Sequence, residues 1–150
     1  MPIATKSSKF DISKESDTAK IARKFSKRIK KGDTLLFFGE IGVGKTTFIR
    51  YFINNFQKTK RAKQTEVTSP TFTLLNEYEI KDLIIQHYDL YRLKNKKELK
   101  NIGFLDNFEN EITLVEWAEK IAKKPKNRIE LHFEYKAKLD KRILKIYDFR

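Results

Sequence analysis

The sequence predicts a single α/β domain built around a phosphate-binding loop, and three observations support this fold class. Gly39–Thr46 matches the pattern G-x-x-x-x-G-K-[ST] of the P-loop. The apolar stretch Thr34–Phe38 leads into the loop as a short buried strand, and apolar residues at helical spacing follow it. The chain has 150 residues, of which 39% are hydrophobic and 13% aromatic, which suffices for one core and leaves no room for a second. We therefore expect residues 1–150 to form one P-loop domain.

The loop supplies the residue types that binding of a nucleotide phosphate requires. Its glycines allow backbone N–H groups to turn inward on an anion, and the N-terminus of the following helix adds positive potential. The Lys45 ammonium can reach the β- and γ-phosphates, and the Thr46 hydroxyl can bind Mg²⁺. We expect Lys45 to be solvated when no ligand is bound. The residues predicted to surround the phosphates are Gly39, Glu40, Ile41, Gly42, Val43, Gly44, Lys45, Thr46 and Thr47. The helix predicted to begin near Lys45 places on one face Phe48, Ile49, Phe52, Ile53 and Phe56.

Composition restricts the cellular setting. The sequence has no cysteine, which excludes disulfides and cysteine-based zinc sites and fits a reducing compartment. No run approaches the ~18 apolar residues of a membrane-spanning helix. Residues 1–6 have no signal-peptide core, so we expect a cytoplasmic protein without membrane contact. The net charge of +13 allows contact with nucleic acid or an acidic partner, but the lysines are scattered and no aromatic RNA-binding motif accompanies them. A lysine-rich solvated surface is therefore the favoured interpretation of the charge.

The residues before the P-loop strand predict a strand and then a helix. Residues 9–12 read as the short strand. Ser16 or Asp17 is expected to cap the helix, whose basic C-terminal end suits the helix dipole. Gly32 and Asp33 are expected to stop it. The apolar face of this helix consists of Ile21, Ala22, Phe25 and Ile29.

Two further strands are predicted after the P-loop helix. The runs 72–80 and 83–92 are rich in β-forming residues. Lys81 and Asp82 lie between them, so a hairpin is the simplest arrangement.

Hydroxyl and carboxylate groups near these strands are candidates for the nucleotide site. Ser69 and Thr71 lie in the hydroxyl-rich segment Val67–Leu74. From the residues alone, a switch loop that offers a hydroxyl to Mg²⁺ or the γ-phosphate and an ordinary strand entry are equally supported. Asp89, near the end of the second run, is either a ligand of Mg²⁺ or of the attacking water, or a surface residue. His87, taken alone, is more typical of a satisfied polar residue than of a ligand.

A later apolar strand, residues 112–117, closes on an acid. Glu116 at its end is the best candidate for the acidic partner of the P-loop, because an acid at this place holds Mg²⁺ or orients the attacking water in P-loop enzymes. Trp117 is either a core residue, which we favour, or a neighbour of the nucleotide. Before this strand, residues 98–102 predict a short helix and residues 104–110 a second helix or a turn.

The C-terminal part of the chain predicts an antiparallel hairpin. Residues 128–135 and 142–147 both alternate between apolar and polar side chains, as half-buried strands do. Residues 137–141 are expected to form the turn.

Four motifs in this order match one family. They are Gly39–Thr47, Val67–Leu74, His87–Arg92 and Leu114–Trp117. With them the chain resembles, over nearly its whole length, the bacterial tRNA threonylcarbamoyladenosine biosynthesis ATPase family TsaE, also called the YjeE family. Four ordered motifs are far more specific than a P-loop alone. The departures are small: Ala118 stands where the family usually has proline, and Glu40 and Ile41 stand where it usually has Asp and Leu.

The resemblance implies a compact P-loop domain with a mixed central sheet flanked by helices. It implies Mg²⁺-dependent hydrolysis of ATP to ADP, slow in the isolated chain and coupled to partner proteins of the TsaB and TsaD type. Those partners make N6-threonylcarbamoyladenosine in tRNA, and we expect this subunit to contact tRNA only indirectly. The implied catalytic residues are Lys45, Asp89 and Glu116, the metal ligands Thr46, Asp89 and Glu116, and the further nucleotide neighbours Ser69, Thr71 and Trp117. Two other functions stay open, a small-molecule P-loop kinase and a non-catalytic RNA-binding module.

Overall fold

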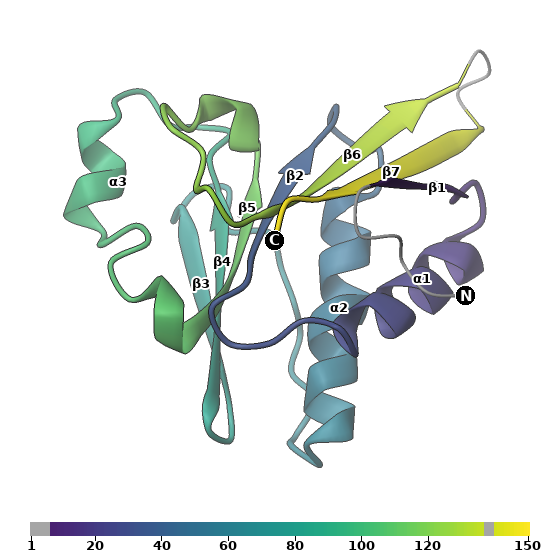
Figure 1. Cartoon of the computed structure of the whole chain (residues 1–150), viewed down its shortest axis with the longest axis horizontal. Coiled ribbons are helices and arrows are strands. Elements are labelled where there is room, and N and C mark those ends of the chain that lie inside the picture. The colour runs from purple at the N-terminus through teal and green to yellow at the C-terminus, as the bar shows by residue number, and fades with distance from the viewer. Residues whose placement is uncertain (1–6, 137–139) are drawn as a thin grey trace.

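The computed structural model describes residues 7–136 and 140–150. Within these ranges the chain forms a seven-stranded mixed sheet with helices on both faces (Figure 1), which confirms the predicted α/β fold class. The strands are β1 (Ser7–Asp11), β2 (Thr34–Phe38), β3 (Leu75–Ile80), β4 (Leu83–Asp89), β5 (Glu111–Glu116), β6 (Ile129–Tyr135) and β7 (Arg142–Asp148). The helices are α1 (Glu15–Ser26), α2 (Lys45–Thr59) and α3 (Lys97–Asn101), with short 3₁₀ turns η1 (Phe108–Asn110) and η2 (Ala118–Lys120). No helix in the described ranges is both long and apolar enough to cross a membrane.

The sheet has a parallel centre and antiparallel margins. Its strand order is β1-β7-β6-β2-β5-β4-β3. Strand β2 is parallel to both β5 and β6, and β4 is parallel to β5. The two predicted hairpins are confirmed, since β3 pairs antiparallel with β4 and β6 with β7. The centre of the second hairpin's turn, residues 137–139, lies outside the described residues. Because β2, β4 and β5 run the same way, their carboxyl ends meet at one edge of the sheet.

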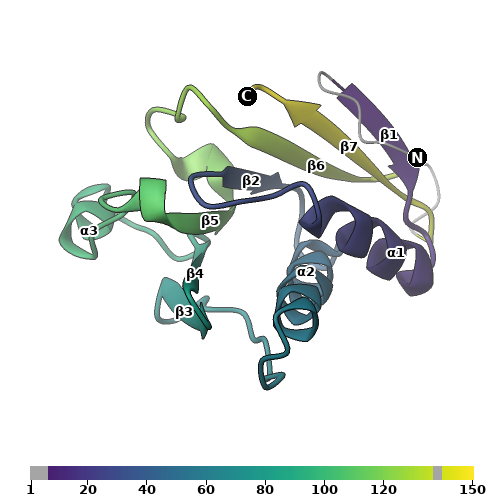
Figure 2. The same ribbon diagram turned by 60° about the horizontal axis from the view of Figure 1, so that its bottom comes forward.

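Two hydrophobic cores cover the two faces of the sheet. Alternation along β2 sends Leu35 and Phe37 into the larger core, under α1 and α2, and Leu36 into the smaller one, under α3 and its loops. Figure 2 shows α1 and α2 together on one face of the sheet and α3 on the other. The apolar face predicted for α2 is buried at Phe48, Ile49, Phe52 and Ile53. The sheet is therefore held between two layers, and α2 is fixed directly behind the loop that precedes it.

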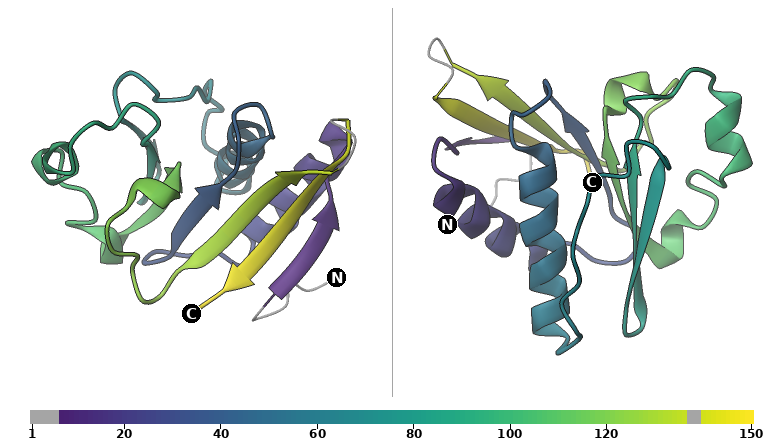
Figure 3. Two further views of the ribbon diagram at one scale, coloured as in Figure 1. Left: turned by 90° about the horizontal axis from the view of Figure 1, so that it is seen from above. Right: turned by 180° about the vertical axis from the view of Figure 1, so that it is seen from behind.

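The segment that follows α2 returns along this helix to the P-loop end of the sheet (Figure 3, right). Near the end of α2, the Gln57 side-chain amide donates a hydrogen bond of 2.9 Å to the Thr65 hydroxyl. Val67, a little further on, is buried in the larger core. These contacts tie the connection to the helix and deliver the hydroxyl-rich segment beside the carboxyl ends of β4 and β5.

Some predicted boundaries of α1 are wrong. The helix begins at Glu15, and its N-cap is Lys14, which makes no side-chain capping bond; Ser16 and Asp17 therefore lie inside the first turn and do not cap it. The helix also ends at Ser26, so the buried Ile29 and the basic residues from Lys27 to Lys31 follow the helix, and the basic residues of its last turn are Arg23 and Lys24.

The limits predicted for β3 and β4 are also corrected. Residues 72–74 form a turn and not the start of a strand, because the Leu74 N–H donates to the Pro70 carbonyl at 2.7 Å and Leu74 has a φ of 69°. Strand β4 ends at Asp89, because the Leu90 N–H bonds the Glu116 carbonyl and Leu93 turns back on Leu90. The chain thus turns away from the sheet directly after Asp89.

Candidate active site

Three parallel strands end together where the P-loop begins. In the registers of the sheet, Glu116 of β5 pairs with Phe37 of β2 on one side and with Asp89 of β4 on the other. The P-loop follows β2, so its lysine and threonine face two acids from neighbouring strands. A cavity of about 300 Å³ lies at this point. Of the residues predicted for the site, those that line the cavity are Ile41, Gly42, Gly44, Lys45, Thr46, Thr47, Ser69, Thr71, Asp89, Glu116 and Trp117. Gly39, Glu40 and Val43 shape the loop outside this lining.

The glycines at the two ends of the loop are required by its backbone. Gly39 has a φ of 144°, and a Cβ there would lie 2.7 Å from the Phe133 carbonyl oxygen. Gly44 has a φ of 114° and is the N-cap of α2. Between them Val43 is fully buried and anchors the loop in the larger core. The loop is therefore held in one shape, with its concave side toward the cavity.

Lys45 is buried, which corrects the expectation that it is solvated without a ligand. Only 4% of the residue is exposed, its ammonium donates a hydrogen bond to the Gly39 carbonyl, and it lies 3.7 Å from the centre of the Trp117 ring. Burial lowers the pKa of Lys45, while the charges of Glu116, Glu119 and Asp89 oppose this shift. An anion in the cavity would restore favourable surroundings for the charged ammonium.

Glu116 is the centre of a buried hydrogen-bonded chain. The Thr46 hydroxyl donates to its Oε1 at 2.9 Å, and His87 Nε2 lies 2.7 Å from its Oε2. An ionised carboxylate only accepts hydrogen bonds, so with Glu116 ionised the Nε2 of His87 is the donor of this contact. His87 is fully buried, and its Nδ1 has no hydrogen-bond partner among the described residues. The interpretation of His87 as a satisfied polar residue missed this contact with the acid.

Asp89 forms a second cluster with the switch segment. Its Oδ2 accepts hydrogen bonds from Ser69 at 2.8 Å and from Thr71 at 3.0 Å, and its Oδ1 accepts the Tyr91 N–H at 2.9 Å. Only 3% of Asp89 is exposed, so the alternative of a surface aspartate is wrong. The structure thus brings Thr46 together with Glu116, and Ser69 and Thr71 together with Asp89, on two sides of one cavity.

The donor set of the cavity fits a magnesium ion that also binds phosphate. No group of three or more histidines, cysteines or acids that could hold a metal occurs within the described ranges. Mg²⁺ does not need such a cage, because it binds through one or two carboxylates together with phosphates and water. Thr46 Oγ1 and Glu116 Oε1 are 2.9 Å apart. Neighbouring ligands of an octahedral ion with bonds of ~2.1 Å lie about 3 Å apart, so these two oxygens have a suitable spacing.

Two residues that line the cavity were missed by the sequence analysis. Tyr91 packs its ring against Trp117, with centroids 5.0 Å apart. Arg142 comes from β7, and its Nη1 lies 3.8 Å from the place where a Cβ of Gly44 would stand. Trp117 itself packs against the smaller core, as we favoured, and also lines the cavity, while its contact with a nucleotide stays a prediction. A basic group and two rings therefore border the loop, besides the predicted residues.

Comparison with known proteins agrees with this geometry. The family model "Threonylcarbamoyl adenosine biosynthesis protein TsaE" matches residues 12–144. Among curated proteins, "tRNA threonylcarbamoyladenosine biosynthesis protein TsaE" of Rickettsia felis is 37% identical over 108 residues, 72% of this chain. The Bacillus subtilis protein of the same name is 34% identical over 117 residues, 77% of this chain and 70% of that protein. The crystal structure of Bacillus subtilis YdiB has a TM-score of 0.75 at 26% identity and covers 99% of this chain and 90% of its own.

The matched stretch is shorter than some of these relatives. It spans 61% of the Rickettsia felis protein and 59% of the Rickettsia conorii protein, which is less than two thirds of each. The family model nevertheless extends from the residue after β1 into the first half of β7, and all four sequence motifs fall within it. The chain belongs to the TsaE family of threonylcarbamoyl adenosine biosynthesis proteins.

Proposed function

We propose that this chain is a Mg²⁺-dependent ATPase that supports threonylcarbamoyladenosine modification of tRNA in the cytoplasm, together with transferase proteins of the TsaB and TsaD type. The observation that carries the proposal is the contact between the two halves of the site, in which Thr46 of the P-loop helix bonds Glu116 at the end of β5. Phosphate-binding and acidic groups are then within reach of the same phosphoryl group.

The roles of the chain's residues follow from their positions. Loop N–H groups and Lys45 bind the β- and γ-phosphates, and the ammonium exchanges its contact with the Gly39 carbonyl for one with the phosphates. Thr46 and Glu116 would hold Mg²⁺, which when bound neutralises charge on the phosphates. Glu116, fixed by His87, orients the attacking water, and Asp89 holds the switch segment through Ser69 and Thr71. Arg142 adds positive charge beside the loop.

Exposed apolar side chains near the cavity support a role for partner proteins. Ile41, which lines the cavity, is 64% exposed, and Phe72, next to Thr71, is 81% exposed. Tyr91 is 40% exposed at the same cavity. Large apolar groups gathered at one place on a surface are typical of protein interaction sites. A partner that covers these groups would also touch the loop and the switch segment, and so could couple ATP turnover to its own cycle.

Neither alternative function is favoured by the comparisons. A small-molecule kinase needs a pocket for a phosphoryl acceptor, and the described ranges contain one arginine in the lining of the nucleotide cavity, Arg142, and no arginine-rich lid. A purely non-catalytic RNA-binding module leaves the buried Glu116 and His87 without a role. Release of inorganic phosphate from ATP without any phosphorylated acceptor would separate the proposed ATPase from a kinase.

The proposed function predicts that this protein sustains repeated cycles of tRNA modification. We expect the isolated chain to hydrolyse ATP slowly. Added with ATP to the transferase pair and tRNA, it should raise the yield of modified tRNA above one per transferase. The measurement is modified tRNA per transferase over time, with a non-hydrolysable ATP analogue as control. A yield that stays at a single turnover with ATP would contradict the proposal.

Lys45→Ala should weaken nucleotide binding. It removes a charge-assisted contact with the phosphates worth roughly 1.5–3 kcal/mol, which corresponds to a fall in ATP affinity of about 10- to 100-fold. Isothermal titration with ATP and Mg²⁺ measures the change, and Lys97→Ala on α3 is a control that removes the same charge from an exposed site. Because Lys45 is buried, a thermal melt must accompany the titration. Unchanged affinity in a folded variant would exclude the phosphate-binding role.

A further inference from the structure

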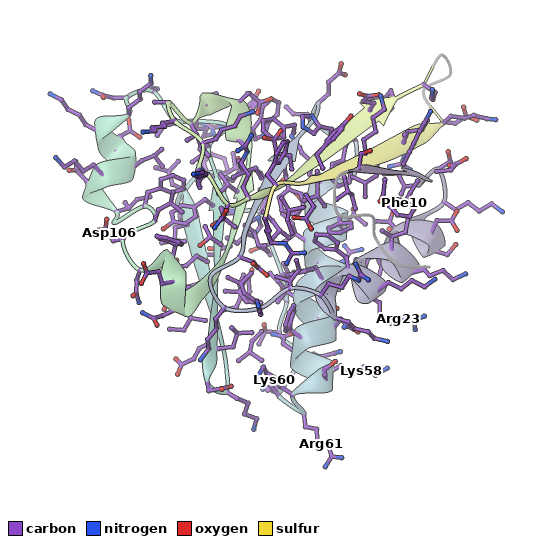
Figure 4. The ribbon with its side chains drawn as sticks, viewed as in Figure 1. Phe10, Arg23, Lys58, Lys60, Arg61 and Asp106 are labelled. Carbon is purple, nitrogen blue, oxygen red and sulfur yellow. The ribbon has the colours of Figure 1, made fainter. Side chains whose placement is uncertain are left out.

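Among the described residues, two cationic side chains line the nucleotide cavity, Lys45 and Arg142. Other cations of this basic protein extend into solvent. Arg23, Lys58 and Arg61 are exposed and point away from the rest of the molecule in Figure 4. Arg142 is only partly exposed, and it forms no ion pair within the described part of the chain. Its guanidinium is therefore a positive charge at a phosphate-binding cavity that no acid of these residues neutralises.

The backbone and the side chain of Arg142 are both held by the turn between β1 and α1. Its N–H donates to the Ser13 hydroxyl at 3.1 Å, its carbonyl accepts the Ile12 N–H at 3.0 Å, and its Nη2 donates to the Ser13 carbonyl at 3.5 Å. Ser13 is itself fixed, because its N–H donates to Asp11 Oδ1 at 2.9 Å. With Nη2 held in this way, Nη1 lies 3.8 Å from the place where a Cβ of Gly44 would stand. The guanidinium is thus positioned by the protein itself, which lowers the entropy cost of binding a ligand.

The P-loop rests on the strand next to Arg142. The Tyr135 hydroxyl, on β6, donates to the Ile41 carbonyl at 3.5 Å. The loop and β6 also meet at Gly39, where a Cβ would lie 2.7 Å from the Phe133 carbonyl oxygen. Strand β7, which carries Arg142, pairs with β6 along its whole length. The position of Arg142 beside the loop is therefore set by the pairing of the sheet and not by its side chain alone.

The strand order places Arg142 and the two acids of the site on opposite sides of the loop. Strands β6 and β7 lie on one side of β2, and β5 and β4, which end in Glu116 and Asp89, lie on the other (Figure 1). Thr46 and Glu116, the proposed holders of Mg²⁺, belong beside the β- and γ-phosphates, because the metal bridges these two groups in P-loop enzymes. The α-phosphate is the one that then extends toward the other side of the loop, where Arg142 stands.

We propose that Arg142 binds the α-phosphate of the nucleotide beside the N-terminus of α2. This assignment deepens the proposed ATPase function and rests on it. A guanidinium forms strong, charge-assisted hydrogen bonds with phosphate oxygens. The α-phosphate takes no part in the transfer of the γ-phosphoryl group, so the contact is equally strong in the ground state and in the transition state. Arg142 therefore sets the affinity for ATP and ADP, whereas an arginine finger contacts the transferred group and sets the rate.

The test measures binding of ATP, ADP and inorganic tripolyphosphate by isothermal titration. We expect Arg142→Ala to bind each of the three about 10-fold more weakly, because each places a phosphate beside Arg142. Lys141→Ala is the matched control, since it removes the same charge from the neighbouring exposed residue and should change affinity by less than about 3-fold. Arg142→Lys, which keeps the charge, should fall between the two. The backbone bonds to Ser13 and Ile12 remain in every variant, so each should fold, and a thermal melt checks this.

Hydrolysis kinetics distinguish the α-phosphate from the rest of the nucleotide. Arg142→Ala should raise the ATP concentration for half-maximal rate about 10-fold and lower the single-turnover rate at saturating ATP by less than about 3-fold. A fall of about 100-fold at saturation would make Arg142 an arginine finger and overturn the proposal. Weaker binding of ATP and ADP with unchanged binding of tripolyphosphate would assign Arg142 to the nucleoside and also overturn it, as would unchanged affinity for all three ligands.

These outcomes are separate from failure of the proposed function. In each of them the unmodified chain still binds and hydrolyses ATP, so the ATPase proposal stands while the role of Arg142 falls. An unmodified chain that binds no ATP would contradict the ATPase proposal, and the assignment of Arg142 would fall with it.

Discussion

Glu116→Gln should slow ATP hydrolysis roughly 100-fold or more, about 3 kcal/mol at the barrier, while ATP affinity changes by less than about 3-fold. The substitution keeps the shape of the side chain and removes its charge. Glu116 accepts hydrogen bonds from Thr46 and His87 at 2.9 and 2.7 Å. A neutral amide accepts through only one of its two terminal atoms, so one of these contacts is lost together with the charge that orients water or holds Mg²⁺. Both roles act mainly on the transition state, because the loop and Lys45 bind the ground-state phosphates.

Single-turnover hydrolysis of labelled ATP, alongside a binding titration at fixed Mg²⁺, separates these effects. Glu119→Gln is a matched control. Glu119 is exposed and lies three residues after Glu116, and its charge, like that of Glu116, raises the pKa of Lys45. We expect it to retain most of the activity. Hydrolysis at the wild-type rate by Glu116→Gln would make this residue a structural strand end, and Asp89 would then be the next candidate for the acidic partner of the P-loop.

The parts of the site that the sequence predicts are those carried by local patterns. The P-loop is contiguous, and Glu116 follows an apolar run, so strand, loop, helix and acid could all be placed without the fold. The partner of Glu116 could not. His87 reaches it because β4 and β5 lie side by side in parallel, with His87 opposite Leu114 and Asp89 opposite Glu116. Register between strands distant in sequence is set by packing and leaves no signal in either segment alone.

Arg142 and the burial of Lys45 escape sequence analysis for related reasons. Arg142 lies in an alternating strand of the C-terminal hairpin, and only the strand order β7-β6-β2 brings it near the P-loop. The burial of Lys45 depends on Trp117, the residue that follows β5. The last residue of β5, Glu116, lies 70 residues after Thr46 in the sequence, and the backbone turns at Trp117 with a φ of 58°.

A cluster of phenylalanines connects the P-loop helix to the sheet. Phe48, in the first turn of α2, is fully buried. Its ring lies 5.9 Å from Phe25 of α1, 5.8 Å from Phe37 of β2 and 5.9 Å from Phe133 of β6. The contacts with Phe25 and Phe133 are edge-to-face, a favoured arrangement of aromatic rings. One side chain thus joins both helices and two central strands directly behind the residues that bind phosphate.

Phe48→Ala should lower the free energy of unfolding by about 3–5 kcal/mol, because it removes a large buried ring and leaves a cavity that the surrounding rings fill only in part. Domains of this kind are stable by only ~5–15 kcal/mol, so the loss is a large share of the total and should lower the melting temperature on the order of 10 °C. Urea unfolding measures the change. Phe72→Ala is the matched control, since Phe72 is 81% exposed and its loss should cost less than about 0.5 kcal/mol. Phe48→Leu, which keeps most of the volume, should fall between the two. Equal stability of Phe48→Ala and Phe72→Ala would show that the aromatic cluster does not hold the P-loop helix in place.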